Sequence, residues 1–503
     1  MLPTLPLYRA NALRAMEAHA SAALGGDAMR LMQRAGQAAW RELLAHWPRA
    51  LRLAVSCGPG NNGGDGYVLA LHALQSGRDV QVVHPPGHAP RSALARRAHA
   101  DFVAAGGRVS VFDGGLPTTD LLVDALFGIG LDRAPDAGCA GLIDAVNTSG
   151  QPVLALDVPS GLDADTGHVP GAVVIAHRTL EFIARHVGNR TGAAADCVGT
   201  LALASLDVAP DDITASSPDA GWLQPDALAA LRPRSRIAHK GRHGHVLCIG
   251  GDHGFGGAIL LCAEATLRAG AGLASVVTRT AHVGPLLARR PECMALAADD
   301  AEALPPLPAR VDVLAVGPGL GRGRWGRALF GQALAAGRPL VVDADALNLL
   351  AEDEGTLPGS DCVLTPHPGE AARLLAGGGE GDVAGIERDR LGAAQALASR
   401  FDCTVVLKGA GSVIASPGRL PVLIGAGNPG MAVGGMGDVL TGVIASLRAQ
   451  GHAPPEAAAL GALLHAAAAD LAAGDGERGL LPADLLPALR RLANPACDGR
   501  EVA

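Results

Sequence analysis

Lysine is almost absent from this chain of 503 residues. Only Lys240 and Lys408 occur among the 41 lysines and arginines, which leaves 41 − 2 = 39 arginines. Against such a background, a lysine is expected where a site needs a compact ammonium rather than a planar guanidinium. The alternative is that both lysines stand where they do by chance. The sequence favours a functional role over chance for Lys408, but it favours neither explanation for Lys240.

Aromatic residues and positive charge are also scarce. The chain contains 4 Trp, 2 Tyr and 7 Phe, and its formal net charge is −8. Proteins that bind single-stranded nucleic acid use aromatic stacking platforms and a basic surface. The composition therefore excludes nucleic acid as an expected partner.

Paired cysteines, a secretory signal and a clear membrane span are missing too. The nine cysteines are never closer than fourteen positions, so no C-x-x-C pair is available for zinc or dithiol chemistry. The N-terminal stretch lacks a charged segment followed by a continuous apolar one. The apolar stretch 457–473 is largely alanine and contains His465 and Asp470, which favours a buried helix. We expect a cytoplasmic protein with reduced, mostly buried thiols and no membrane partner.

The length and the distribution of polar residues predict two domains. A chain of this length suggests two or more cores at about 100–200 residues per domain. The polar segment 211–221 is interpreted as a linker, which separates a first domain at 1–214 from a second at 224–503.

Both halves alternate short apolar runs with stretches of helical length. The runs are 51–56, 80–83, 121–123 and 153–156 in the first half, and 245–249, 273–278, 311–316, 340–342, 361–364 and 404–407 in the second. This alternation predicts an α/β fold in each half, with a parallel sheet covered by helices on both faces. Ligands of such sheets bind beyond the carboxyl ends of the strands.

The first glycine-rich turn carries too many polar side chains for an ordinary dinucleotide loop. Residues 58–66 read GPGNNGGDG, with a helix expected from about Tyr67. The G-x-G-x-x-G match is weak by itself, and the Asp65 carboxylate would repel a pyrophosphate on the same amides. The alternative is a turn in which Asn and Asp only cap the helix.

Two further strand ends carry oxygen-rich side chains. The run 121–123 leads into DALFGIGL at 124–131, and the run 153–156 leads into DVPSGLD at 157–163. Three such ends in one sheet form a crevice suited to a hard cation and a polar substrate.

In the second half, the strongest signal is GGMGDVLTG at 434–442, which runs into an apolar helical stretch. The glycines free backbone amides at a helix N-terminus, where an anion is favoured. Asp438 lies in the first turn and either caps the helix or removes a proton from an attacking hydroxyl. Lys408 opens the loop KGAGS after the last predicted strand, and GGDHGFGGA (250–258), GPGLG (317–321), DADAL (343–347) and TPHPGE (365–370) each follow a predicted strand.

The motifs GNNGGDG, DALFGIGL and DVPSGLD together resemble the N-terminal epimerase domain of the bifunctional NAD(P)H-hydrate repair enzymes. The resemblance implies a Rossmann-like three-layer domain with Asp157 as acid or base. In the segment 179–188, where relatives commonly carry a lysine, this chain has Arg185 and His186. The implied potassium ligands are Asn62, Asp124 and Ser160. The implied substrate-binding residues are Asn61, Asn62, Gly63, Gly64, Asp65, Gly128, Ile129, Gly130, Leu131, Asp132, Arg133, Ala134 and Asp157.

The second-half motifs, in this order over about 224–495, resemble the ADP- or ATP-dependent NAD(P)H-hydrate dehydratases, whose fold is ribokinase-like. The resemblance implies that Asp438 deprotonates the ring hydroxyl, which then attacks the terminal phosphoryl group of the nucleotide. The implied hydrate-binding residues are Ala258, Gly319, His367 and Asp438. The implied nucleotide-binding residues are Lys408, Gly409, Ala410, Gly411, Ser412 and Gly437.

The same resemblance implies the cofactors and partners. Potassium is expected in the epimerase domain, and magnesium with ADP in the dehydratase domain, with NADH hydrate and NADPH hydrate as substrates of a homo-oligomer. ADP is preferred to ATP only by this resemblance. A ribokinase-like vitamin or thiazole kinase is the alternative enzyme, and a non-catalytic binding role is the alternative for the first half.

Overall fold

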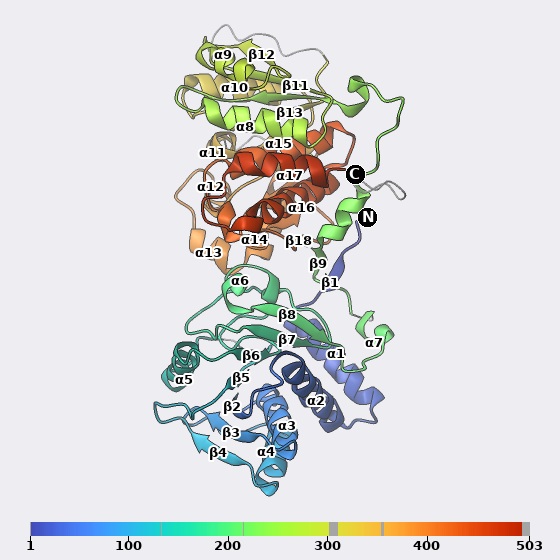
Figure 1. Cartoon of the computed structure of the whole chain (residues 1–503). Coiled ribbons are helices and arrows are strands. Elements are labelled where there is room, and N and C mark those ends of the chain that lie inside the picture. Colours follow the sequence, from blue (N-terminus) through green and yellow to red (C-terminus); the bar gives the residue numbers. More distant parts are fainter. Residues whose placement is uncertain (1, 132, 215, 301–309, 354–356, 495–503) are drawn as a thin grey trace. The chain divides into compact units, whose positions relative to one another are not determined.

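The computed structural model describes residues 2–131, 133–214, 216–300, 310–353 and 357–494. These residues form two compact units (Figure 1). One unit comprises Pro6–Ala220, and the other comprises the described residues from Gly221 onward together with those up to Leu5. The polar segment 211–221 is not a plain linker, since it contains the short helix α7 (Pro210–Thr214) and the start of strand β9 (Ala220–Leu223).

The N-terminal unit is built on a seven-stranded sheet in the order β4-β3-β2-β5-β6-β7-β8, and every neighbouring pair is parallel. Its strands are β2 (Arg52–Cys57), β3 (Asp79–His84), β4 (Arg108–Val111), β5 (Leu121–Ala125), β6 (Val153–Leu156), β7 (Arg178–Phe182) and β8 (Thr200–Ala204). Its remaining helices are α1 (Ala10–Ala23), α2 (Ala28–His46), α3 (Asn61–Gln75), α4 (Ala93–Ala104), α5 (Ala137–Thr148) and α6 (Ala194–Cys197).

Helices cover both faces of this sheet because successive residues of each strand point to opposite sides. Leu53 and Val55 of β2 belong to one core with residues of α1 to α4. Ala54, between them, belongs to a second core with Leu142 and Ile143 of α5. The predicted three-layer α/β/α arrangement is confirmed (Figure 1).

The C-terminal unit contains an eleven-stranded sheet in the order β1-β9-β18-β17-β16-β15-β14-β13-β10-β11-β12. The pairs from β12 to β16 are parallel, and β17 runs antiparallel to both of its neighbours. The strands not yet given are β1 (Leu5–Leu7), β10 (His245–Ile249), β11 (Leu273–Thr278), β12 (Met294–Ala297), β13 (Val313–Val316), β14 (Leu340–Val342), β15 (Cys362–Leu364), β16 (Thr404–Leu407), β17 (Val413–Ala415) and β18 (Val422–Ile424).

Ten α-helices accompany this sheet within the described residues. They are α8 (Gly256–Arg268), α9 (Thr280–Arg289), α10 (Arg324–Ala335), α11 (Ala344–Glu352), α12 (Pro368–Ala376), α13 (Val383–Arg388), α14 (Arg390–Phe401), α15 (Met436–Ala449), α16 (Pro454–Ala472) and α17 (Leu485–Leu492). One face of the sheet, including Val246, Val313 and Val406, forms a single core with α8, α15, α16 and α17. The alternate strand residues, such as Leu314 and Leu407, are fully buried as well. This is the α/β unit that the second half predicts.

The alanine-rich segment forms the buried helix α16, as predicted, and its residues Ala457–Ala469 are buried. Of the part of the chain that the structure describes, only Pro454–Asp475 is long and apolar enough to cross a membrane, and most of this apolar stretch is buried inside the protein. The eight described cysteines are also free and buried, which agrees with the expected reduced thiols. Cys497 lies outside the described residues.

Candidate active sites

A cavity of about 430 Å³ lies at the carboxyl ends of β2, β5 and β6 in the N-terminal unit. Predicted residues that line it are Asn61, Asn62, Asp65, Gly128, Ile129, Gly130, Leu131, Arg133, Ala134 and Asp157. Asp132 lies outside the described residues. The three strand ends therefore meet at one site, as the sequence predicts.

Gly63 and Gly64 do not line this cavity. An added Cβ on Gly63 would lie 2.0 Å from the carbonyl oxygen of Gly58, and one on Gly64 would lie 2.4 Å from Cε of Met32. Both glycines are buried and allow close packing around the start of α3. The prediction of a helix from about Tyr67 was wrong, because α3 begins at Asn61. The first turns of this helix carry the polar side chains to the cavity.

Three carboxyl groups influence one another at the cavity. Desolvation raises the pKa of Glu17 to about 7, with a further contribution from Asp157. Burial, followed by the charges of Asp157 and Glu17, raises the pKa of Asp65 well above its usual value. Burial also raises the pKa of Asp157, although His186 opposes this shift. A carboxyl group with a raised pKa can exchange protons near neutral pH.

Asp157 is held in an uncommon backbone conformation beside a buried histidine. Its φ is 67°, in the left-handed region of backbone conformation that residues other than glycine rarely adopt. Oδ1 of Asp157 lies 3.3 Å from Nε2 of His186, whose side chain is 1% exposed. When protonated, His186 therefore lies close enough to lower the pKa of Asp157 through its positive charge. The sequence named His186 and Arg185 together and could not choose between them.

Several residues at this cavity were missed from the sequence. Arg14 and Glu17 come from α1, His88 and Asp136 come from connecting loops, and Phe182 ends β7. None lies in a glycine-rich motif, and only the tertiary fold brings them together.

The proposed potassium ligands offer several buried oxygen atoms. Asp124 is 1% exposed, and its carboxylate accepts hydrogen bonds from Ser160 N at 2.8 Å and Ser160 Oγ at 2.6 Å. Burial raises the pKa of Asp124 to about 6. Asn62 donates through Nδ2 to the carbonyl of Leu156 at 3.3 Å, and its buried Oδ1 finds no donor among the described residues. An unsatisfied amide oxygen and a buried carboxyl group are both ligands that a hard cation takes.

In the C-terminal unit, the GGMGDVLTG glycines lead directly into α15. Gly435 is the N-cap, with φ of 99°, and Asp438 lies in the first turn, as predicted. The first amides of α15 have no partner within the helix, so they favour an anion. Burial raises the pKa of Asp438 to about 7; Asp343 adds to the shift, and Lys408 opposes it.

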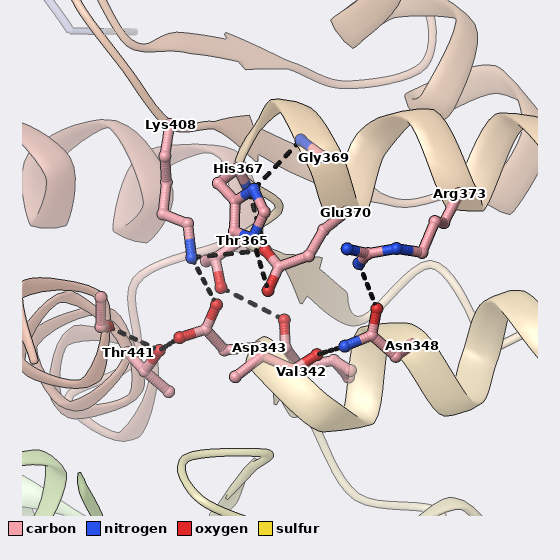
Figure 2. A network of polar contacts seen from close by, with 12 residues as sticks. Val342, Asp343, Asn348, Thr365, His367, Gly369, Glu370, Arg373, Lys408 and Thr441 are labelled. Atoms are coloured by element: carbon pink, nitrogen blue, oxygen red, sulfur yellow. Dashed lines mark hydrogen bonds and ion pairs between the residues drawn. The ribbon is translucent and has the colours of Figure 1, made fainter. Parts of the chain in front are cut away.

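Lys408 is the centre of a polar network beside α15 (Figure 2). Its Nζ lies 2.7 Å from Oδ1 of Asp343 and 3.7 Å from Oε2 of Glu370. Thr441 donates to the other oxygen of Asp343 at 2.8 Å. Burial alone would lower the pKa of Lys408, but Asp343 and Glu370 outweigh it, so the pKa is raised. The ammonium is therefore permanently charged in the physiological range.

Other members of the predicted nucleotide loop differ in their surroundings. An added Cβ on Gly437 would lie 3.3 Å from Nζ of Lys408, so the helix start and the lysine meet. Gly409 packs against the guanidinium of Arg390 with φ of 138°. Ser412 donates to the carbonyl of Gly409 at 3.0 Å, within its own loop, while Ala410 is exposed and Gly411 is half-buried.

The predicted hydrate-binding residues Ala258 and Gly319 are neighbours. An added Cβ on Gly319 would lie 3.3 Å from Cβ of Ala258, which joins the loop after β13 to the start of α8. His367 is the N-cap of α12 and accepts a hydrogen bond from Gly369 N at 3.0 Å, while its own amide donates to Glu370 at 2.8 Å. Burial, followed by the charge of Lys408, lowers the pKa of His367. The ring is thus a capping group as well as a candidate ligand.

Asp343 and Glu370 were not among the predicted site residues, although both lie in quoted motifs. Asp343 follows β14 directly, is 1% exposed and holds Lys408. Burial raises the pKa of Glu370 to about 7, and Lys408 opposes this shift. For Asp343, the available sequence signal was an acid directly after the fully apolar strand β14.

Lys240 lies apart from this network. It is exposed in the 3₁₀ helix η3 (Lys240–His243), which precedes β10 and therefore lies at the amino end of that strand. A cavity of about 1260 Å³ also lies toward that end, and none of its lining residues belongs to a predicted site. Composition alone could not distinguish the two lysines.

Comparison with known proteins gives matches over both units. A family model described as YjeF-related protein N-terminus matches residues 28–188, and one described as NAD(P)H-hydrate dehydratase matches residues 246–491. A solved ADP/ATP-dependent NAD(P)H-hydrate dehydratase from Bacillus subtilis, co-crystallized with ATP and Mg²⁺, is 29% identical with a TM-score of 0.49, covering 53% of this chain and 95% of that chain.

Curated relatives align over nearly the whole chain. The bifunctional NAD(P)H-hydrate repair enzyme Nnr of Escherichia coli is 43% identical over 97% of this chain and 94% of its own length. The bifunctional NAD(P)H-hydrate repair enzyme of Leishmania braziliensis is 41% identical over 97% and 93%. At this identity and coverage, the chain belongs to the family of bifunctional NAD(P)H-hydrate repair enzymes.

Proposed function

We propose that this chain repairs hydrated NADH and NADPH in two steps. The N-terminal unit interconverts the R and S hydrates, and the C-terminal unit dehydrates the S form with ADP, releasing AMP and phosphate. The observation that carries the proposal is Asp438, a half-buried carboxyl group with a pKa of about 7 in the first turn of α15, beside the Lys408 network.

In the dehydration step, Asp438 removes the proton of the ring hydroxyl. The hydroxyl oxygen then attacks the terminal phosphoryl group of ADP, and the bond between that group and AMP breaks. The ring nitrogen donates its electron pair to expel the new phosphate ester as phosphate, and the resulting iminium loses a proton from the neighbouring ring carbon, which gives NAD(P)H. A general base with a pKa near the working pH is well suited to the first transfer.

The nucleotide phosphates are expected at the start of α15. An added Cβ on Gly437, at this helix start, would lie 3.3 Å from Nζ of Lys408, the loop Gly409–Ser412 follows Lys408 directly, and the helix N-terminus favours the phosphate charge. The carboxylate of Glu370 provides an oxygen ligand of the kind magnesium takes together with substrate phosphates. Bound magnesium would neutralise phosphate charge. Lys408→Arg replaces the compact ammonium by a planar guanidinium, so nucleotide affinity should fall. Unchanged affinity would mean that the lysine stands at this position by chance.

Ala258, Gly319 and His367 are proposed to hold the hydrate next to Asp438. The loops of Ala258 and Gly319 meet in the structure, and His367 is tied to Glu370 of the Lys408 network. A polar ring nitrogen and two small residues would suit a bulky nicotinamide ring with one hydroxyl.

In the epimerisation step, Asp157 is proposed to transfer a proton to and from the hydrated ring, so that the hydrated centre opens and recloses. His186, whose Nε2 lies 3.3 Å from Oδ1 of Asp157, is proposed rather than Arg185 to act at the position where relatives commonly carry a lysine. Asn62, Asp124 and Ser160 would hold potassium, which supplies a positive charge beside the acid-rich cavity. The substrate then lies along Asn61, Asp65 and the 128–134 loop.

The proposal also places the reaction in the cytoplasm, which the eight free, buried thiols support. It includes a homo-oligomer, which sedimentation of the purified chain would test. The assay described next also measures whether the chain prefers ADP to ATP and which of the two hydrates it prefers.

Product identity tests the proposed function. The full chain is incubated with an R/S hydrate mixture, potassium, magnesium and either ADP or ATP. Reduced nicotinamide and inorganic phosphate should then form in equal amounts. A stable phosphorylated alcohol without released phosphate would instead identify a small-molecule kinase, and an unchanged mixture would identify a binding protein.

A further inference from the structure

The largest fully buried side chain among the described residues belongs to Arg390, which is 1% exposed. Arg390 is the first residue of α14 and follows the N-cap Asp389. Arginine is rarely buried, because burial removes the charged guanidinium from water. A positive charge in the first turn of a helix is also opposed by the helix dipole. Arg390 therefore stands at this position against two energetic costs, and such local conflicts are expected where a residue serves a function.

The ion pair of Arg390 offsets only part of these costs. Nη1 donates a hydrogen bond to Oε2 of Glu387 at 3.0 Å, but the Glu387 side chain is 47% exposed and keeps much of its water. An ion pair with one hydrated partner contributes little to stability. Nε of Arg390 is buried and finds no acceptor among the described residues. The contact that distinguishes this guanidinium is its second hydrogen bond, which goes to the loop after β16.

The guanidinium holds the first peptide of the proposed nucleotide loop. Nη2 of Arg390 donates a hydrogen bond to the carbonyl oxygen of Lys408 at 2.9 Å. The guanidinium also packs against Gly409, since an added Cβ there would lie 2.5 Å from Nη2 and 3.0 Å from Cζ. Gly409 has φ of 138°, so glycine is required both for this backbone conformation and for this close approach. Arg390 thus fixes the peptide that joins Lys408 to Gly409.

The backbone and the side chain of Lys408 are each held by a different partner. Its amide donates to the carbonyl oxygen of Pro366 at 2.9 Å, and its carbonyl accepts from Arg390. Its ammonium lies 2.7 Å from Oδ1 of Asp343 and would lie 3.3 Å from an added Cβ on Gly437 at the start of α15. Lys408 therefore links Arg390 directly to the place where the nucleotide phosphates are expected.

We propose that Arg390 is a positioning residue for the nucleotide. Its guanidinium holds the start of the loop Gly409–Ser412 in the conformation that receives the nucleotide, so this backbone does not have to become ordered on binding. Preorganisation of this kind strengthens binding because it removes the entropic cost of ordering. Arg390 acts through Lys408 and Gly409 rather than by contact with the nucleotide. The inference rests on the nucleotide site of the proposed function and adds to it a residue outside the glycine-rich motifs.

Two substitutions of Arg390 test this role by calorimetric titration of the full chain with ADP and magnesium. Arg390→Met keeps a long side chain in the buried space, and the half-exposed Glu387 carboxylate stays hydrated, so no buried charge is left behind. Arg390→Lys keeps the charge but lacks the planar fork that reaches Glu387 and the Lys408 carbonyl together. Both variants should bind ADP at least about 10-fold more weakly, the lower end of what loss of a hydrogen bond from a charged donor costs.

Kinetics and a matched control distinguish positioning from a purely structural role. The KM for ADP should rise with the dissociation constant, whereas kcat at saturating ADP and the KM for the hydrate should change less than about twofold. Glu387→Gln removes the ion pair but leaves the contact with the loop, so ADP affinity should also change less than about twofold.

Thermal melting of each variant completes the test. The proposal is overturned if both Arg390 variants bind ADP as wild type does, or if Glu387→Gln weakens ADP binding as much as Arg390→Met does. Failure of both Arg390 variants to fold would also overturn it, because the residue would then be purely structural. Wild type that binds neither ADP nor ATP would instead refute the proposed nucleotide site, and the role of Arg390 with it.

Discussion

Replacing Lys408 by methionine tests the polar network of the C-terminal unit. The substitution keeps a long side chain but removes the ammonium that lies 2.7 Å from Oδ1 of Asp343. Asp343 is 1% exposed, and its remaining partner is the hydroxyl of Thr441 at 2.8 Å. The variant therefore leaves a buried carboxylate without its cation.

The cost follows from the burial of the pair. Removing one partner of a buried ion pair destabilises a protein by about 3–5 kcal/mol. The Lys408 side chain retains 19% exposure, so water offsets part of the loss and we expect about 3 kcal/mol. Because about 1.4 kcal/mol corresponds to a factor of ten, hydrogen exchange through opening of this region should be about 100-fold faster.

Hydrogen exchange of the full chain, followed by mass spectrometry, measures this change. Peptides that contain β14 and β16 should lose protection in Lys408→Met, while peptides that contain β2 of the other unit are the internal control. Asp343→Asn combined with Lys408→Met removes the uncompensated charge and should recover part of the protection. Additive effects of the two substitutions would refute the reasoning, because they would mean that the two groups do not interact.

Two further predictions concern the reacting groups. The kcat/KM of dehydration should rise with pH through about 7, since Asp438 acts as a base only when deprotonated and its pKa is raised to about 7. Asp345→Asn removes a negative charge that raises this pKa, so the acidic limb of the pH profile should move to lower pH; an unmoved limb would contradict the electrostatic account. Gly128→Ala should slow epimerisation without unfolding the unit, because the added Cβ would lie 2.8 Å from Oδ2 of Asp157. Gly115→Ala, where nothing lies within 4 Å, is the control in both rate and thermal-melting measurements, and equal rates in the two variants would refute this prediction.

The parallel sheets were predictable because their strands are short apolar runs. All ten predicted runs correspond to observed strands, from β2 in the first half to β16 in the second. Strands such as β7 and β8 were missed. β7 contains Arg178 and Glu181, and the side chains of β8 are mostly half-buried, so neither reads as a continuous apolar run.

The site was predictable where a motif follows a strand and unpredictable where tertiary contacts decide. The position of Asp157 at the cavity and that of Asp438 in the first turn of α15 were predictable, because each residue lies directly after a strand or within a glycine-rich motif. Glu17 belongs to a helix that begins far from those motifs, and only folding brings it to the cavity. Gly63 and Gly64 do not line the cavity, and by spacing alone a glycine that permits packing cannot be told from one that contacts a ligand.

The time course of conversion of an R/S hydrate mixture tests most directly that one chain carries two complementary active sites. Wild type with ADP, magnesium and potassium should convert the whole mixture to reduced cofactor. Asp157→Asn should stop after rapid conversion of the S fraction, and Asp438→Asn should form almost no reduced cofactor, with a loss of about 10²–10⁴-fold in rate, while still interconverting the epimers. The account is contradicted if Asp438→Asn dehydrates the hydrate at the wild-type rate, or if Asp157→Asn converts both epimers as fast as wild type does.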